Sequence, residues 1–155
     1  MDMKTFKIND AATTQALGQR LGQIVSAGDV ILLDGDLGAG KTTFTKGLAL
    51  GLGIERNIKS PTFTIIREYK TGRLPLYHMD VYRLEDGGGD ELGLDEYFNG
   101  NGVCVVEWSQ FVASELPTEY LKIAFKRDDR DLDSTNRTLT ITAHGTHYTE
   151  ILEQL

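Results

Sequence analysis

The chain has 155 residues, of which 40% are hydrophobic and 25% are charged, and its formal net charge is −7. These values are typical of one globular domain, so we expect residues 1–155 to form a single domain. The acidic balance disfavours autonomous binding of nucleic acid, which usually relies on a surplus of lysine and arginine. The longest apolar runs, 30–33 and 103–106, are far shorter than the roughly 20 residues of a membrane span, and the N-terminus lacks a secretory signal pattern. We therefore expect a cytoplasmic protein without membrane association.

The first third of the chain predicts a strand, a helix, a second strand, a glycine-rich loop and a second helix. Residues 5–8 are a strand candidate, and Asp10 offers a side-chain cap for a helix that extends to about residue 27. Residues 30–33 form a short apolar run between turn residues, which is typical of a buried strand in a parallel sheet. The second helix then places its apolar residues on one face: Phe44, Leu48 and Leu52.

Glycines interrupt the first predicted helix at positions 18 and 22. Each costs about 1 kcal/mol of helix propensity relative to alanine. Because glycine has no Cβ, Gly18 and Gly22 would permit close packing of another backbone against this helix.

The rest of the chain predicts mainly strands. We expect a hairpin through Thr71 and Gly72, an acidic glycine-rich loop, a short helix, a buried strand, two alternating strands and a closing helix. These elements cover residues 64–69, 74–82, 85–90, 92–98, 103–106, 120–126, 138–143 and 147–155. The fold class that follows is α/β, with a mixed central β-sheet flanked by helices in a P-loop NTPase domain.

The segment between the first buried strand and the second helix matches the phosphate-binding pattern G-x-x-x-x-G-K-[ST] at residues 35–42. Its glycines can take positive φ, so that backbone N–H groups wrap around phosphate oxygens. Lys41 would place its charge against the β- and γ-phosphates, and the Thr42 hydroxyl can ligate magnesium. We therefore predict that ATP or ADP, with Mg²⁺, is bound by Asp36, Leu37, Gly38, Ala39, Gly40, Lys41, Thr42 and Thr43.

Acidic residues end two of the apolar strands. Glu107 directly follows residues 103–106, as a Walker-B acid does, at the strand end where ligands bind in open α/β sheets. Strand alternation would place His78, Asp80 and Tyr82 on one side of their strand. Phosphoryl transfer needs a carboxylate for magnesium and a group that orients the nucleophile, which makes Glu107 and Asp80 candidates. The alternative for each acid is a solvated strand end, and a structural role is favoured over a catalytic base for His78.

A Ser-Pro-Thr-Phe segment occupies residues 60–63, shortly after the second helix. Many P-loop proteins have a loop there that senses the γ-phosphate, and the hydroxyls of Ser60 and Thr62 could reach the metal or that phosphate. The alternative is a proline-containing loop that enters a strand. The sequence contains no N-K-x-D box of the kind expected in a guanine-specific GTPase, so ATP is favoured over GTP.

Four blocks together resemble the bacterial TsaE (YjeE) family, in the same order and over nearly the whole chain. They are residues 35–43, 60–63 and 78–83 (His-Met-Asp-Val-Tyr-Arg), and the pair Glu107-Trp108. Members of this family are small ATPases required to form threonylcarbamoyladenosine in tRNA, together with TsaB and TsaD. The resemblance implies that this chain hydrolyses ATP in complex with TsaB and TsaD and reaches tRNA through that complex.

The resemblance also implies individual roles. Thr42 and Glu107 would hold magnesium, Asp80 would assist hydrolysis, and Ser60 with Thr62 would form a switch segment. The candidate catalytic residues are Asp80, Lys41 and Thr62. Arg137, near the start of the penultimate strand, would contact the nucleotide. Two other functions remain open for a P-loop chain of this size: a small-molecule kinase, with residues 126–130 as its basic lid, and a nucleotide-sensing adaptor without significant catalysis.

Overall fold

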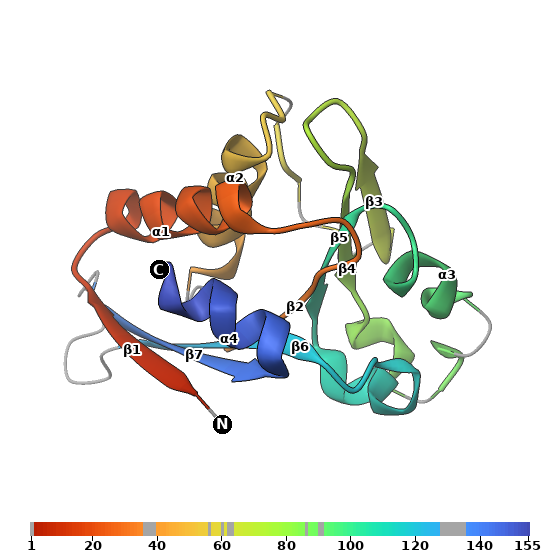
Figure 1. The fold of residues 1–155 in the computed structure, drawn as a ribbon. Coiled ribbons are helices and arrows are strands. Elements are labelled where there is room, and N and C mark those ends of the chain that lie inside the picture. The colour runs from red at the N-terminus through yellow and green to blue at the C-terminus, as the bar shows by residue number, and fades with distance from the viewer. Residues whose placement is uncertain are drawn as a thin grey trace.

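The computed structural model describes residues 2–35, 40–55, 57–59, 61, 64–85, 87–89, 92–127 and 136–155. Within these ranges, seven strands form one mixed sheet in the order β1-β7-β6-β2-β5-β4-β3 (Figure 1). The strands are β1 (Met3–Ile8), β2 (Val30–Asp34), β3 (Ile66–Tyr69), β4 (Leu76–Asp80), β5 (Val103–Glu107), β6 (Tyr120–Arg127) and β7 (Arg137–His144). The α-helices are α1 (Ala11–Ile24), α2 (Lys41–Gly51), α3 (Leu94–Phe98) and α4 (Thr146–Glu153). The predicted α/β class with a mixed, helix-flanked sheet is confirmed.

The centre of the sheet is parallel and its margins are antiparallel. β2 pairs in parallel with both β5 and β6, and β4 pairs in parallel with β5. The outer pairs β1–β7, β6–β7 and β3–β4 are antiparallel, which confirms the predicted hairpin. The carboxyl ends of β2, β4, β5 and β6 therefore lie at the same edge of the sheet, where the glycine-rich segment also begins.

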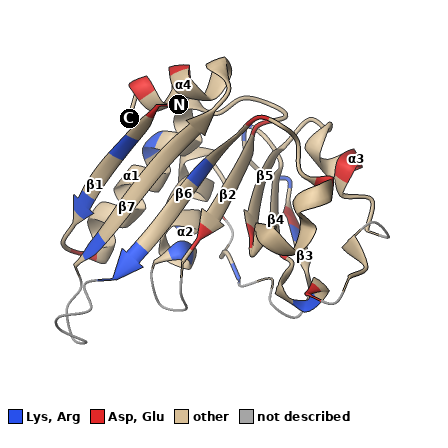
Figure 2. Ribbon diagram, turned by 90° about the horizontal axis from the view of Figure 1, so that it is seen from below, with Lys and Arg blue, Asp and Glu red and all other residues tan. Residues whose placement is uncertain are grey.

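Two apolar cores lie on opposite faces of the sheet. Ile31 and Leu33 pack with residues of α1, α2 and α4, whereas Val30 and Leu32 pack with residues of α3 and of the 3₁₀ helices η1 (Tyr82–Leu84) and η3 (Ser109–Glu115). In Figure 2, α1 and α2 lie behind β1, β7 and β6. Because β2 is buried on both faces, its uninterrupted apolar run is the pattern that a central parallel strand requires.

Some helix and strand boundaries differ from those predicted from the sequence. Asp10 does cap α1, accepting a hydrogen bond from the Thr13 N–H, but the helix ends at Ile24 rather than near residue 27. Strand β4 ends at Asp80, so the prediction that Tyr82 lies on one side of a strand with His78 and Asp80 is wrong. Tyr82 begins η1 and is 47% exposed. No helix in the described ranges is long and apolar enough to cross a membrane.

Helices α1 and α2 pack against each other through glycines of both helices, and Gly18 and Gly22 of α1 permit the close packing that the sequence predicts. A Cβ at Gly18 would lie 2.3 Å from the Phe44 carbonyl oxygen, and one at Gly22 would lie 2.2 Å from the Leu48 carbonyl oxygen. On the facing helix, a Cβ at Gly47 would lie 2.0 Å from the Gln15 carbonyl oxygen. Each distance is too short for a carbon atom, so the backbones can pack this closely only because the side chains are absent.

We predict that Gly22→Ala destabilises the fold, although alanine gains about 1 kcal/mol of helix propensity. The added methyl group must push α1 away from α2, and such overpacking costs about 1–3 kcal/mol. Urea unfolding should therefore show a lower free energy of unfolding for this variant. Gln23→Ala, at an exposed position of the same helix, is the control and should change stability by less than about 0.5 kcal/mol. A Gly22→Ala chain at least as stable as the parent would contradict the proposed close contact.

Candidate functional site

The described ends of the glycine-rich segment have the backbone geometry that its sequence predicts. Gly35 follows β2 with a φ of 147°, and Gly40 immediately precedes α2 with a φ of 108°. Side chains rarely tolerate such positive φ values, so glycine is required at both positions. Asp36, Leu37, Gly38 and Ala39 lie outside the described residues, and their predicted contacts with a nucleotide stay predictions.

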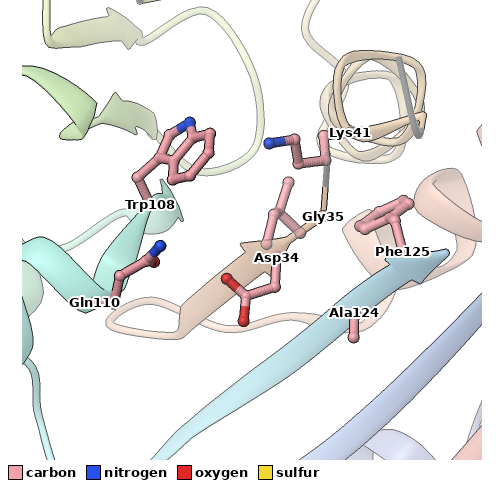
Figure 3. Close-up of a pocket in the computed structure, with 8 residues that line it drawn as sticks. Asp34, Gly35, Lys41, Trp108, Gln110, Ala124 and Phe125 are labelled. Atoms are coloured by element: carbon pink, nitrogen blue, oxygen red, sulfur yellow. The ribbon is translucent and has the colours of Figure 1, made fainter. Parts of the chain in front are cut away.

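A cavity of about 350 Å³ opens at the end of β2, between α2 and the segment that follows β5 (Figure 3). Lys41 points across it from the first turn of α2 towards the indole of Trp108. The cavity occupies the edge of the sheet at which ligands bind in open α/β folds. Its lining residues are Leu33, Asp34, Gly35, Lys41, Trp108, Gln110, Ala124 and Phe125.

Lys41 is the basic side chain of the cavity lining, and only 8% of the residue is exposed. Its Nζ lies 3.5 Å from Oε1 of Glu107 and 5.0 Å from the centroid of the Trp108 ring. Trp108 has a φ of 62°, a left-handed conformation that is uncommon for a residue with a side chain. The ammonium group is thus held between a carboxylate and an aromatic face.

Glu107 ends β5 and is 7% exposed, and its second carboxylate oxygen, Oε2, lies 2.7 Å from Nε2 of His78. Burial alone would raise the pKa of Glu107. The hydrogen bond from His78, with the charges of His78 and Lys41, outweighs burial and lowers the pKa below its usual value. Glu107 therefore stays ionised, as a magnesium ligand must be.

Asp80 lies beside Glu107, because the two residues are partners in the parallel register of β4 and β5. Asp80 is 6% exposed, and its Oδ1 accepts a hydrogen bond from the backbone N–H of Tyr82 at 3.0 Å. Both acids are therefore buried at neighbouring strand ends, which contradicts the alternative that they are solvated. Their catalytic and metal-binding roles stay predictions.

The other predicted residues are less closely grouped. Thr42 is exposed and Thr43 is half-buried in the first turn of α2. Arg137 begins β7 opposite Arg127, at the same edge of the sheet as the cavity but separated from β2 by β6. Arg137 is not among the residues that line the cavity, and its nucleotide contact stays a prediction. Ser60 and Thr62 lie outside the described residues.

The side chains at this edge suit a magnesium ion that is bound partly by phosphate. Glu107 and Thr42 offer a carboxylate and a hydroxyl oxygen, the ligand types that Mg²⁺ prefers. The described residues contain no group of three or more His, Cys, Asp and Glu side chains arranged to hold a metal. Mg²⁺ is commonly bound by one or two protein ligands, with nucleotide phosphates and water completing its coordination, so this donor set fits.

Sequence reasoning missed several contacts of the site. Sequence patterns point to His78 and Glu107 individually but do not pair them, and they do not indicate the contact of Trp108 with Lys41. Phe125 and Ala124 were read only as residues of a strand. No local signal identifies these contacts, because they depend on which strands and helices are neighbours in the fold.

Comparisons with known proteins identify the family. The model of the family described as "Threonylcarbamoyl adenosine biosynthesis protein TsaE" matches residues 8–138. A tRNA threonylcarbamoyladenosine biosynthesis protein TsaE from Bacillus subtilis (strain 168) is 55% identical over 142 residues, covering 92% of this chain and 87% of that protein. The protein of the same name from Treponema pallidum (strain Nichols) is 48% identical over 134 residues, covering 84% of this chain and 94% of that protein.

The fold agrees with this relationship. The crystal structure of YdiB from Bacillus subtilis superimposes with a TM-score of 0.86 at 46% sequence identity, over 99% of this chain and 93% of that one. The family match, the sequence relatives and the shared fold all cover most of the chain. This chain therefore belongs to the TsaE family of threonylcarbamoyladenosine biosynthesis proteins.

Proposed function

We propose that this chain is an ATPase subunit that serves threonylcarbamoyladenosine formation in tRNA and hydrolyses ATP in complex with TsaB and TsaD. The main support for the proposal is the ion pair between Lys41 and Glu107, which lies beside the cavity at the carboxyl edge of the sheet. These are the basic and acidic residue types that phosphoryl transfer from a nucleotide requires. Lys41 begins α2 directly after the glycine-rich segment, and Glu107 ends the neighbouring parallel strand β5.

The position of each site residue supports a separate role in ATP hydrolysis. Backbone N–H groups at the start of α2 would bind phosphate oxygens, aided by the positive end of the helix dipole. Lys41 would neutralise charge on the β- and γ-phosphates. Glu107 and Thr42 would hold magnesium, which when bound offsets the negative charge that develops on the phosphoryl oxygens. Asp80, buried beside Glu107, would orient the attacking water.

The choice of partners rests on the family. The related proteins from Bacillus subtilis and Treponema pallidum are named for tRNA threonylcarbamoyladenosine biosynthesis. A net charge of −7 suits a subunit that docks on proteins and meets tRNA through them. The isolated chain is then expected to turn over ATP slowly, with TsaB and TsaD raising the rate.

Calorimetry with ATP, ADP and GTP in the presence of Mg²⁺ tests the nucleotide site, and phosphate release with and without TsaB and TsaD tests turnover. The proposal expects binding of ATP and ADP, weaker binding of GTP, and hydrolysis by the complex. Phosphate moved to a metabolite instead of water would favour a kinase. Binding without turnover under both conditions would favour an adaptor. An absence of nucleotide binding would contradict the ATPase, kinase and adaptor functions alike.

Lys41→Met should weaken nucleotide binding and also change the fluorescence of the ligand-free chain. Trp108 is the only tryptophan in the sequence, so its emission reports the charge 5.0 Å from its ring. We expect a shifted emission spectrum without nucleotide and at least a tenfold loss of ATP affinity by calorimetry. Lys46→Met removes an exposed lysine of the same helix and should change neither. Parent-like emission from Lys41→Met would contradict the contact with Trp108.

Asp80→Asn should lower ATP turnover by about 100-fold, since orienting or deprotonating a nucleophile typically contributes 10²–10⁴. Nucleotide affinity should stay near that of the parent, because an asparagine oxygen can still accept the hydrogen bond from the Tyr82 N–H. Turnover by the complex and calorimetry measure the two quantities. Glu153→Gln, at an exposed position of α4, is the control. Unchanged turnover in Asp80→Asn would remove Asp80 from the mechanism.

A further inference from the structure

His78 makes one polar contact with its imidazole ring in the described part of the protein. The residue lies in β4 and is 0% exposed. Its Nε2 is 2.7 Å from Oε2 of Glu107, whereas its Nδ1 is buried and has no hydrogen-bond partner among the described residues. Because a carboxylate oxygen can only accept, Nε2 must carry the hydrogen and donate it.

Packing alone does not explain a histidine at this position. Leaving a buried polar atom such as Nδ1 without a partner costs about 1–3 kcal/mol, a cost that an apolar side chain of similar shape would avoid. The neighbouring strand residues Tyr77 and Met79 belong to the apolar core on the opposite face, and His78 shares its own face with Leu76 of the other core. The ring therefore sits in a largely apolar setting, and its hydrogen bond to Glu107 is the polar interaction it gains.

That hydrogen bond fixes the orientation of the Glu107 carboxylate. With Oε2 bound by His78, the other oxygen, Oε1, is the one that faces Lys41, a residue of the cavity lining. Free rotation about the last carbon–carbon bond of the glutamate side chain would exchange the two oxygens, and donation from the rigid imidazole opposes it. Hydrogen bonds from buried groups to metal-ligating carboxylates commonly set both the orientation and the affinity of the site.

We propose that His78 is a positioning residue, which holds Glu107 so that Oε1 is presented to the magnesium–phosphate site. The inference rests on the proposed function, because it assigns Glu107 to a metal ion. His78 itself touches neither nucleotide nor metal in this assignment; it acts through one carboxylate oxygen.

The test compares His78→Gln with His78→Asn in the chain of residues 1–155. A glutamine amide nitrogen can reach the position of Nε2 and donate to Glu107, whereas the shorter asparagine places its amide near the position of Nδ1. The readout is the Mg²⁺ concentration that gives half of the magnesium-dependent gain in ADP affinity, measured by calorimetry at several Mg²⁺ concentrations. Urea unfolding of each variant measures stability separately. Met79→Val, a change at the neighbouring buried position facing the other core, controls for simple loss of packing.

We expect His78→Asn to raise the required Mg²⁺ concentration about 10-fold or more, in line with the effects of removing such hydrogen bonds. Affinity for ADP without Mg²⁺ should stay close to that of the parent, and His78→Gln should recover most of the loss. Met79→Val should lower stability without changing the Mg²⁺ requirement.

Three results would overturn the inference. A parent-like Mg²⁺ requirement in His78→Asn would limit His78 to a structural role, and failure of His78→Gln to recover would exclude the Nε2 hydrogen bond as the cause. Both leave the proposed function intact, because the parent still binds ADP with Mg²⁺. A parent chain that binds no ADP at any Mg²⁺ concentration would end the proposed function, and the positioning role would fail with it.

Discussion

The buried ion pair between Lys41 and Glu107 is the constraint on which the geometry of the site depends. Each residue is less than 9% exposed, and a charge so far from water is tolerated only with a partner. The pair joins the first turn of α2 to the end of β5, two elements that are distant in sequence. Removing one member of a buried pair typically costs 3–5 kcal/mol, so the pair holds the first turn of α2 beside the end of β5.

Other features place the two partners within reach of each other. The glycine contacts let the backbone of α2 pack directly against that of α1, including at Phe44 near the start of α2. On the other side, β5 runs parallel to β2, so Glu107 emerges beside the end of the strand that leads into the glycine-rich segment. Backbone packing between helices and the pairing of distant strands thus bring together a lysine and a glutamate that lie far apart in the sequence.

The difference between features set by neighbouring residues and contacts set by long-range pairing explains what could be predicted from the sequence. The cap at Asp10, the buried strand at β2 and the hairpin between β3 and β4 follow from residues close together in the chain, and all were predicted correctly. The contact of His78 with Glu107 depends on β4 being the neighbour of β5, which no spacing reveals. The same limit applies to Arg137, whose contact with the nucleotide stays a prediction. The place of β7 beyond β6, set by long-range pairing, determines its distance from the cavity.

Under the proposed function, the ligand-free arrangement has an electrostatic consequence for nucleotide binding. Phosphate would compete with Glu107 for the Lys41 ammonium group, and magnesium would compete with Lys41 for Oε1 of Glu107. If phosphate alone bound Lys41, or magnesium alone bound Glu107, the other residue would lose its ion-pair partner and remain a buried charge, which is costly. If both arrive together, each charge exchanges one partner for another. Under that function, the Lys41–Glu107 pair would favour a nucleotide that arrives with its magnesium ion over either component alone.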